Sequence, residues 1–219
     1  MKNISRRHVV FAIALTLPCL RLAQAQNWGI PWTKIPSITV LGNTDDVRVQ
    51  LVRDAVQYWN RIFTELGTPF QLGALSAAAG SLPVEELQAL SSKVLSRSSV
   101  PELPANVYEI EGDIIVALSD GDFISFASRR PNRQKALVAI KGPGFYPMTL
   151  PNVARNVIAH ELGHAIGLGH NSDPTMLMCG RPASCRPNLF ASPTERYFPL
   201  TTEERAMLRT MYPADWQPR

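Results

Sequence analysis

The eleven residues that decide the fold are His160-Glu161-Leu162-Gly163-His164-Ala165-Ile166-Gly167-Leu168-Gly169-His170, or H-E-x-x-H-x-x-G-x-x-H. On a helix, side chains four residues apart share one face, so His160 and His164 can reach one metal ion. Gly167 tolerates the left-handed backbone that ends a helix, and the chain can then return His170 as a third ligand. Three histidine ligands leave a fourth position for water, which is typical of catalytic rather than structural zinc.

Glu161 follows the first of these histidines, so its carboxylate is expected beside the metal rather than on it. At that place a carboxylate can act as a general base toward water. Two histidines and a glutamate alone would also suit a helix that carries them for packing or solubility. The central glycine and the third histidine favour the zinc site. The one remaining histidine, His8, lies in an N-terminal segment that we expect to be removed.

This string resembles the signature of the metzincin zinc peptidases, and the residues after it resemble the matrixin branch of that family. Metzincins have a methionine turn beneath the zinc, and matrixin spacing points to Met178, with Met176 as the less favoured candidate. An ordinary core methionine is the alternative for Met178. The resemblance implies a zinc-dependent endopeptidase that acts on peptide or protein substrates. Its metal ligands would be His160, His164 and His170, and its general base Glu161.

The order of expected elements along the chain also resembles a matrixin catalytic domain. We expect strands over residues 37–41, 70–75, 112–118, 123–128 and 135–141. We expect helices over about 44–66, with Thr44 or Asp45 as cap, over 83–95, from 151–152, and from 201–202, with Thr201 or Thr202 as cap. The resemblance implies an α+β fold with a five-stranded mixed, twisted sheet, a long helix, an active-site helix and a C-terminal helix. It also implies that a substrate strand pairs with the sheet edge at 123–128.

Residues 76–106 look like an insertion relative to a minimal matrixin. We expect loops over 77–81 and 96–106, on either side of the helix at 83–95.

The first 25 residues read as a signal peptide, which leaves 26–219 as a single domain. Basic residues precede an apolar run over 9–20, and Ala23-Gln24-Ala25 gives a small-x-small cleavage site. A retained membrane anchor is the alternative, although the run is short for a bilayer. Ser5-Arg6-Arg7 also resembles a twin-arginine export signal. We expect a secreted or periplasmic protein, without stable membrane insertion and monomeric.

The excess of basic over acidic residues in the chain comes from this leader. The chain has 22 Lys and Arg against 18 Asp and Glu, and the leader holds four of the cations (Lys2, Arg6, Arg7 and Arg21) and no acid. The remainder is therefore balanced, which does not favour nucleic acid or an anionic membrane as partner. A later basic cluster, Arg129, Arg130, Arg133 and Lys135, is expected to be a solvated loop.

Cys179 and Cys185 are an even pair in a chain that we expect to be exported, which predicts a disulfide. An alternative comes from Cys179-Gly180-Arg181-Pro182, which resembles the inhibitory cysteine motif of matrixin propeptides. In that alternative, a free thiolate would bind zinc and keep the enzyme latent. The same residues differ from the usual wall of the matrixin specificity pocket.

Two further expectations concern metals and rival functions. Matrixins bind calcium, and Asp113, Asp120 and Asp122 could serve, although a solvated turn also explains them. No histidines remain for the structural zinc that matrixins commonly carry. The rival functions are a non-catalytic, zinc-stabilised secreted binding module and a zinc hydrolase of cell-wall peptide amides. Glu161 argues against the first, because a structural site needs no base.

Overall fold

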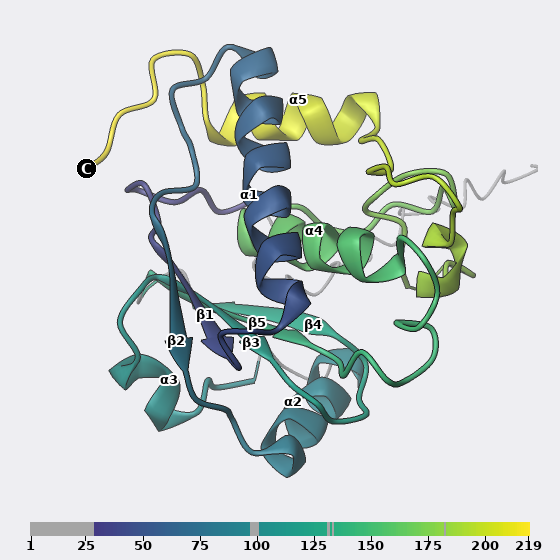
Figure 1. Cartoon of the computed structure of the whole chain (residues 1–219). Helices are drawn as coiled ribbons and strands as arrows, with labels where there is room; N and C mark the ends of the chain where they lie inside the picture. The colour runs from purple at the N-terminus through teal and green to yellow at the C-terminus, as the bar shows by residue number, and fades with distance from the viewer. Residues whose placement is uncertain (1–28, 97–100, 131, 133, 182) are drawn as a thin grey trace, which may run out of the picture.

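A five-stranded sheet is the centre of the molecule (Figure 1). The computed structural model describes residues 29–96, 101–130, 132, 134–181 and 183–219. The strands are β1 (Ile38–Gly42), β2 (Leu75–Ala79), β3 (Ile114–Leu118), β4 (Phe126–Arg130) and β5 (Lys135–Ile140). Their order in the sheet is β2-β1-β3-β5-β4. All neighbours are parallel except β4, which pairs antiparallel with β5 and forms one edge.

Two helices, α1 (Val47–Leu66) and α4 (Val153–Ala165), cover one face of the sheet (Figure 1). Helix α1 begins after Asp46, whose side chain accepts a hydrogen bond from the Arg48 N–H, and ends at Gly67 in the left-handed region. The two helices are joined by Trp59, whose indole N–H donates to the Ala159 carbonyl at 3.0 Å. This packing fixes α4, which carries most of the His–Glu motif, against the sheet.

The C-terminal helix α5 (Thr202–Met211) closes the same core beside α1. Thr201 caps it, and Glu204 completes a capping box by accepting from the Thr201 N–H. Beyond the helix, the ring of Tyr212 stacks on Phe70 with centroids 3.8 Å apart.

The second face of the sheet is covered by α2 (Val84–Ser96) and α3 (Ala105–Glu109). A separate apolar cluster fills this side, with Leu87 and Val107 from the helices against Ile115 and Leu137 from the strands. All four side chains are fully buried. The segment predicted to be an insertion therefore supplies α2 to a second helical layer, whereas α3 begins only at its end.

The predicted α+β class with a five-stranded mixed sheet is confirmed. The long helix, the active-site helix and the C-terminal helix are also present, and Thr201 is the cap of the last. The cap of the long helix was placed wrongly at Thr44 or Asp45, because the side chain that binds the helix N-terminus is that of Asp46. The loop expected over 96–106 ends early in its described part, because α3 begins at Ala105.

The second strand was predicted in the wrong place. Residues 70–75 were expected to form it, but β2 is Leu75–Ala79, which shares only Leu75 with that range and takes in the first three residues of the loop expected over 77–81. Phe70 and Leu72 are apolar because they belong to the core beneath α1, and neither lies in a strand. The alanines become a strand because β1 supplies a parallel partner along their whole length.

The predicted edge strand and the predicted solvated loop also need correction. Residues 123–128 were expected as the edge, whereas β4 is Phe126–Arg130. Arg129 is only 4% exposed, and its guanidinium lies 4.3 Å from the centroid of the Trp32 ring. Lys135 is buried and donates to the Ile110 carbonyl at 2.6 Å. The described cations of this cluster therefore belong to β4 and β5, while Arg133 lies outside the described residues.

Within the described part of the chain, no helix combines the length and apolar character needed to cross a membrane. The signal peptide and its export motif fall on residues 1–25, which lie outside the described residues.

Candidate metal centre

Helix α4 and the turn after it bring the three predicted histidines together. The helix ends in a Schellman arrangement, in which the Leu168 N–H donates to the Gly163 carbonyl (2.9 Å) and the Gly167 N–H to the His164 carbonyl (3.0 Å). Gly167 has a φ of 109°, a backbone conformation that side chains with a Cβ rarely adopt. The chain therefore reverses at Gly167 and returns His170 beside His160 and His164.

A backbone carbonyl orients each of the three imidazole rings. The Nδ1 atoms of His160, His164 and His170 lie 2.7, 2.8 and 2.9 Å from the carbonyl oxygens of Leu177, Leu168 and Arg181. A carbonyl only accepts hydrogen bonds, so each Nδ1 carries the ring proton and donates. Each Nε2 is then a bare lone pair, which is the form that binds a metal.

The three Nε2 atoms converge on one point. That of His170 lies 3.3 Å from that of His160 and 2.9 Å from that of His164. Lone pairs that face one another at this range repel unless a cation lies between them. Tetrahedral zinc with Zn–N bonds of about 2.0–2.1 Å separates its nitrogen ligands by about 3.3–3.4 Å, so the donor set fits zinc with a small outward movement. Three imidazoles suit zinc and not calcium, which takes oxygen ligands.

Burial favours the neutral form of His160 and His164. Loss of solvent lowers the pKa of His160 to about 4, with a smaller contribution from His170 nearby. Burial also holds the pKa of His164 well below its usual value. His160 and His164 are 8% and 4% exposed, whereas His170 is on the surface. The site is thus closed on the side of the helix and open to solvent at His170.

Glu161 lies in the same cleft as the three histidines. It is 7% exposed, and burial raises the pKa of its carboxyl to about 8, while a hydrogen bond from the backbone of Ala127 in β4 lowers it. A divalent cation nearby would lower it further. A carboxyl group poised near neutral pH and held by a backbone N–H is suited to accepting and returning a proton.

Met178 is the buried floor of the site. It is fully buried, and a Cβ built on Gly163 would come within 2.5 Å of its sulfur, so the methionine packs directly under α4. Its carbonyl accepts from the Asn171 N–H at 2.9 Å, which ties the floor to the residue after His170. The three atoms nearest to this built Cβ belong to Met178 and Trp59, and none belongs to Met176, the less favoured candidate.

Asn171 is also fixed from helix α5. Its side-chain amide donates to a carboxylate oxygen of Glu204 at 2.7 Å, and the other oxygen of Glu204 accepts from the Thr201 N–H at 2.8 Å. Glu204 is 6% exposed. One buried carboxylate therefore caps α5 and holds the loop that presents His170, a role that sequence spacing had not indicated.

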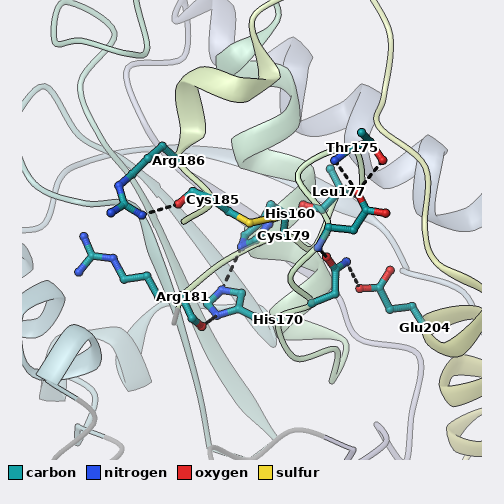
Figure 2. Close-up of a disulfide and its surroundings, with 11 residues drawn as sticks. His160, His170, Thr175, Leu177, Cys179, Arg181, Cys185, Arg186 and Glu204 are labelled. Atoms are coloured by element: carbon teal, nitrogen blue, oxygen red, sulfur yellow. Dashed lines mark hydrogen bonds between the residues drawn. A yellow bond between two sulfur atoms is a disulfide. The ribbon is translucent and has the colours of Figure 1, made fainter. Parts of the chain in front are cut away.

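Cys179 and Cys185 form the predicted disulfide, directly after Met178 (Figure 2). Their Cα atoms lie 5.7 Å apart, within the range of about 4.4–6.8 Å that such bridges require. The bridge closes the loop whose Arg181 carbonyl orients His170. Both cysteines are joined to each other, so the alternative of a zinc-binding thiolate is not the arrangement in this structure.

A cleft of about 260 Å³ opens over the histidines. One wall is the segment from Phe123 to Ala127, and another is made by residues on both sides of the disulfide: Cys179, Gly180, Arg181, Cys185, Arg186, Pro187 and Phe190. Val94 and Leu95, at the end of α2, also line it, so the predicted insertion contributes to the cleft. Sequence reasoning gave no function to this segment, because only the fold brings it next to β4.

The proposed calcium ligands lie in separate ion pairs. Asp113 contacts Lys34 at 2.6 Å, Asp122 contacts Lys141 at 2.7 Å, and Asp120 lies 3.4 Å from Arg48. Among the residues that the structure describes, the only cluster of His, Cys, Asp or Glu able to hold a metal ion is the histidine triad. The calcium prediction is not tested by this arrangement.

Comparisons with known proteins give limited similarity. No family model matches the chain. No curated protein matches it either. An archaemetzincin from Methanopyrus kandleri has a similar structure (TM-score 0.44, 18% identity, 82% of this chain and 96% of that chain covered). So does metalloproteinase-II from Bacteroides fragilis (TM-score 0.46, 16% identity, 84% and 54% covered). At these scores neither neighbour identifies a function, which must come from the chain's own residues.

Proposed function

We propose that this protein is a zinc-dependent endopeptidase of the metzincin type, closest in its motifs to the matrixins. The single observation that carries the proposal is the convergence of three Nε2 lone pairs, each ring held by a backbone carbonyl, beside the buried Glu161 in an open cleft. A purely structural zinc site would close its fourth position and would need no base.

His160, His164 and His170 would hold the zinc ion, and Met178 would support the helix beneath it. Zinc held there would act as a Lewis acid, lowering the pKa of a bound water to about 7 and polarising the scissile carbonyl. Glu161 takes the proton from the attacking water and later passes it to the leaving amine. The Ala127 backbone keeps the Glu161 carboxyl in place between these two steps.

The substrate in this proposal is an extended peptide. Strand β4 is the edge of the sheet, and Ser125, Phe126 and Ala127 line the cleft. A peptide that pairs with this edge would run past the histidines, so the cut would fall within a chain rather than at its end. The mature protein would act as a monomer outside the cytoplasm, in the secreted or periplasmic space. The disulfide supports an oxidising compartment.

A digest of a proteome-derived peptide library tests the proposal. The zinc-loaded protein should cut internal peptide bonds, a chelator should stop it, and added zinc should restore it. Mass spectrometry of the products separates the proposal from its rivals. Zinc binding without any cleavage would favour a binding module. Cleavage confined to cell-wall peptide amides would favour the other zinc hydrolase.

A further inference from the structure

Two arginines, Arg181 and Arg186, line the cleft on the wall that follows the methionine turn. Both side chains are exposed, and Figure 2 shows both extending to the same side of the Cys179–Cys185 bridge. The proposed chemistry uses neither side chain.

The backbone around these arginines is fixed next to the metal centre. The Arg181 carbonyl accepts from His170 Nδ1 at 2.9 Å, and a Cβ built on Gly180 would clash with the His170 ring. The guanidinium of Arg186 donates to the Cys185 carbonyl at 2.8 Å. The disulfide thus closes a short loop that touches His170, with Arg181 inside the loop and Arg186 directly after it.

The charges that line the cleft are mostly positive. Lys141 is the third cation there, and its ammonium group is paired with Asp122 at 2.7 Å. Among the described residues that line the cleft, the only acid is Glu161, which is the general base of the proposed mechanism. No carboxylate of the described chain forms an ion pair with Arg186. A divalent metal ion would add to the positive potential, which attracts anionic groups.

We propose that Arg181 and Arg186 select substrates with an acidic side chain, aspartate or glutamate, close to the scissile bond. The inference rests on the proposed peptidase function and names its substrate class. The planar guanidinium group binds a carboxylate through two parallel hydrogen bonds, so an acid is preferred to its amide. Both arginines are exposed, so we expect a preference on the order of tenfold that weakens with salt.

Binding to the metal-free protein tests this without any catalysis. The probes are fluorescent alanine-rich peptides with blocked ends that differ only by one Glu or Gln. The wild type should bind the Glu peptide about tenfold more tightly at low salt, as measured by fluorescence anisotropy. The double variant Arg181→Ala/Arg186→Ala should bind the two peptides equally. Blocked ends separate a side-chain carboxylate from a C-terminal one: a preference seen only with free C-termini would overturn the proposal.

A second experiment reverses the charge of both arginines. Arg181→Glu/Arg186→Glu should prefer a peptide with Lys at the probe position, and its zinc content should stay that of the wild type. Arg209→Glu is the matched control, because Arg209 is an exposed residue of α5 that does not line the cleft. It should keep the preference for Glu.

The outcomes separate this inference from the proposed function. Cleavage of blocked peptides with no preference for an acid would overturn the inference and leave the peptidase in place. Preferential binding of the Glu peptide with no cleavage by the zinc-loaded protein would support the arginine site and overturn the peptidase. Persistence of the preference in the double alanine variant would show that other groups recognise the acid.

Discussion

Replacing Glu161 by glutamine removes one proton-accepting oxygen from the cleft and almost nothing else. The side chain is 7% exposed, so the amide must fit the same space, and it does because the two side chains have nearly the same shape. The amide oxygen can still accept from the Ala127 backbone. The histidines keep their carbonyl partners, so the metal site should be unchanged.

The expected loss is that of a general base. Such groups contribute about 10²–10⁴-fold to rate, so kcat/KM for Glu161→Gln should fall by that factor. This corresponds to about 3–5 kcal/mol of transition-state stabilisation. Fold stability should not fall, because burial opposes ionisation of the native carboxyl and raises its pKa to about 8.

The assay is peptide hydrolysis by the zinc-loaded variant, with metal content measured on the same sample. Glu203→Gln is the matched control, since Glu203 is an exposed residue of α5 that does not line the cleft. It should retain wild-type turnover. Turnover within tenfold of wild type by a fully zinc-loaded Glu161→Gln would refute the role of Glu161.

Three further predictions concern the frame of the site. Gly167→Ala should lower the free energy of unfolding by about 1–3 kcal/mol and weaken zinc binding, because φ is 109° at this position. Denaturation and metal titration measure the two effects, and Gly144→Ala, which has open space around it, should show neither. Glu204→Ala should cost about 2–4 kcal/mol in urea unfolding, since one carboxylate caps a helix and holds the His170 loop, and Glu203→Ala should cost little. In metal-free Glu161→Gln, the free energy of unfolding should fall as the pH drops from about 6.5 to about 4. His160 has a pKa of about 6.5 in the unfolded chain and about 4 in the folded one, so the unfolded chain is protonated first as the pH falls. The loss from this residue is about 3 kcal/mol, and a free energy of unfolding that does not change with pH would contradict it.

The gathering of the three histidines was predictable because its signal is local. The spacing of His160, His164 and His170, with Gly167 between, already specifies a helix, a turn and a return. The disulfide followed from two cysteines six positions apart in sequence. In each case the chemistry depends on residues within a short segment, whose geometry the backbone alone constrains.

The parts that were missed depend on distant contacts. Strand β2 is a run of small residues that becomes a strand because β1 pairs with it. Phe70 looked like a strand residue, but it is apolar because it packs on Tyr212. Arg129 looked solvated, yet it lies over Trp32 in the interior. The hydrogen bond from the Asn171 side chain to Glu204 joins residues 33 positions apart in sequence, and no periodic pattern indicates it.

The proposed function depends on the binding of one zinc ion by the Nε2 atoms of His160, His164 and His170. Crystallographic anomalous scattering measured on both sides of the zinc absorption edge tests it most directly. We expect a single zinc peak per chain, about 2.0–2.1 Å from Nε2 of His160, His164 and His170, with each Nδ1 still hydrogen-bonded to its backbone carbonyl. A zinc-supplemented crystal without a peak at this point, or with zinc bound through Nδ1, would contradict it.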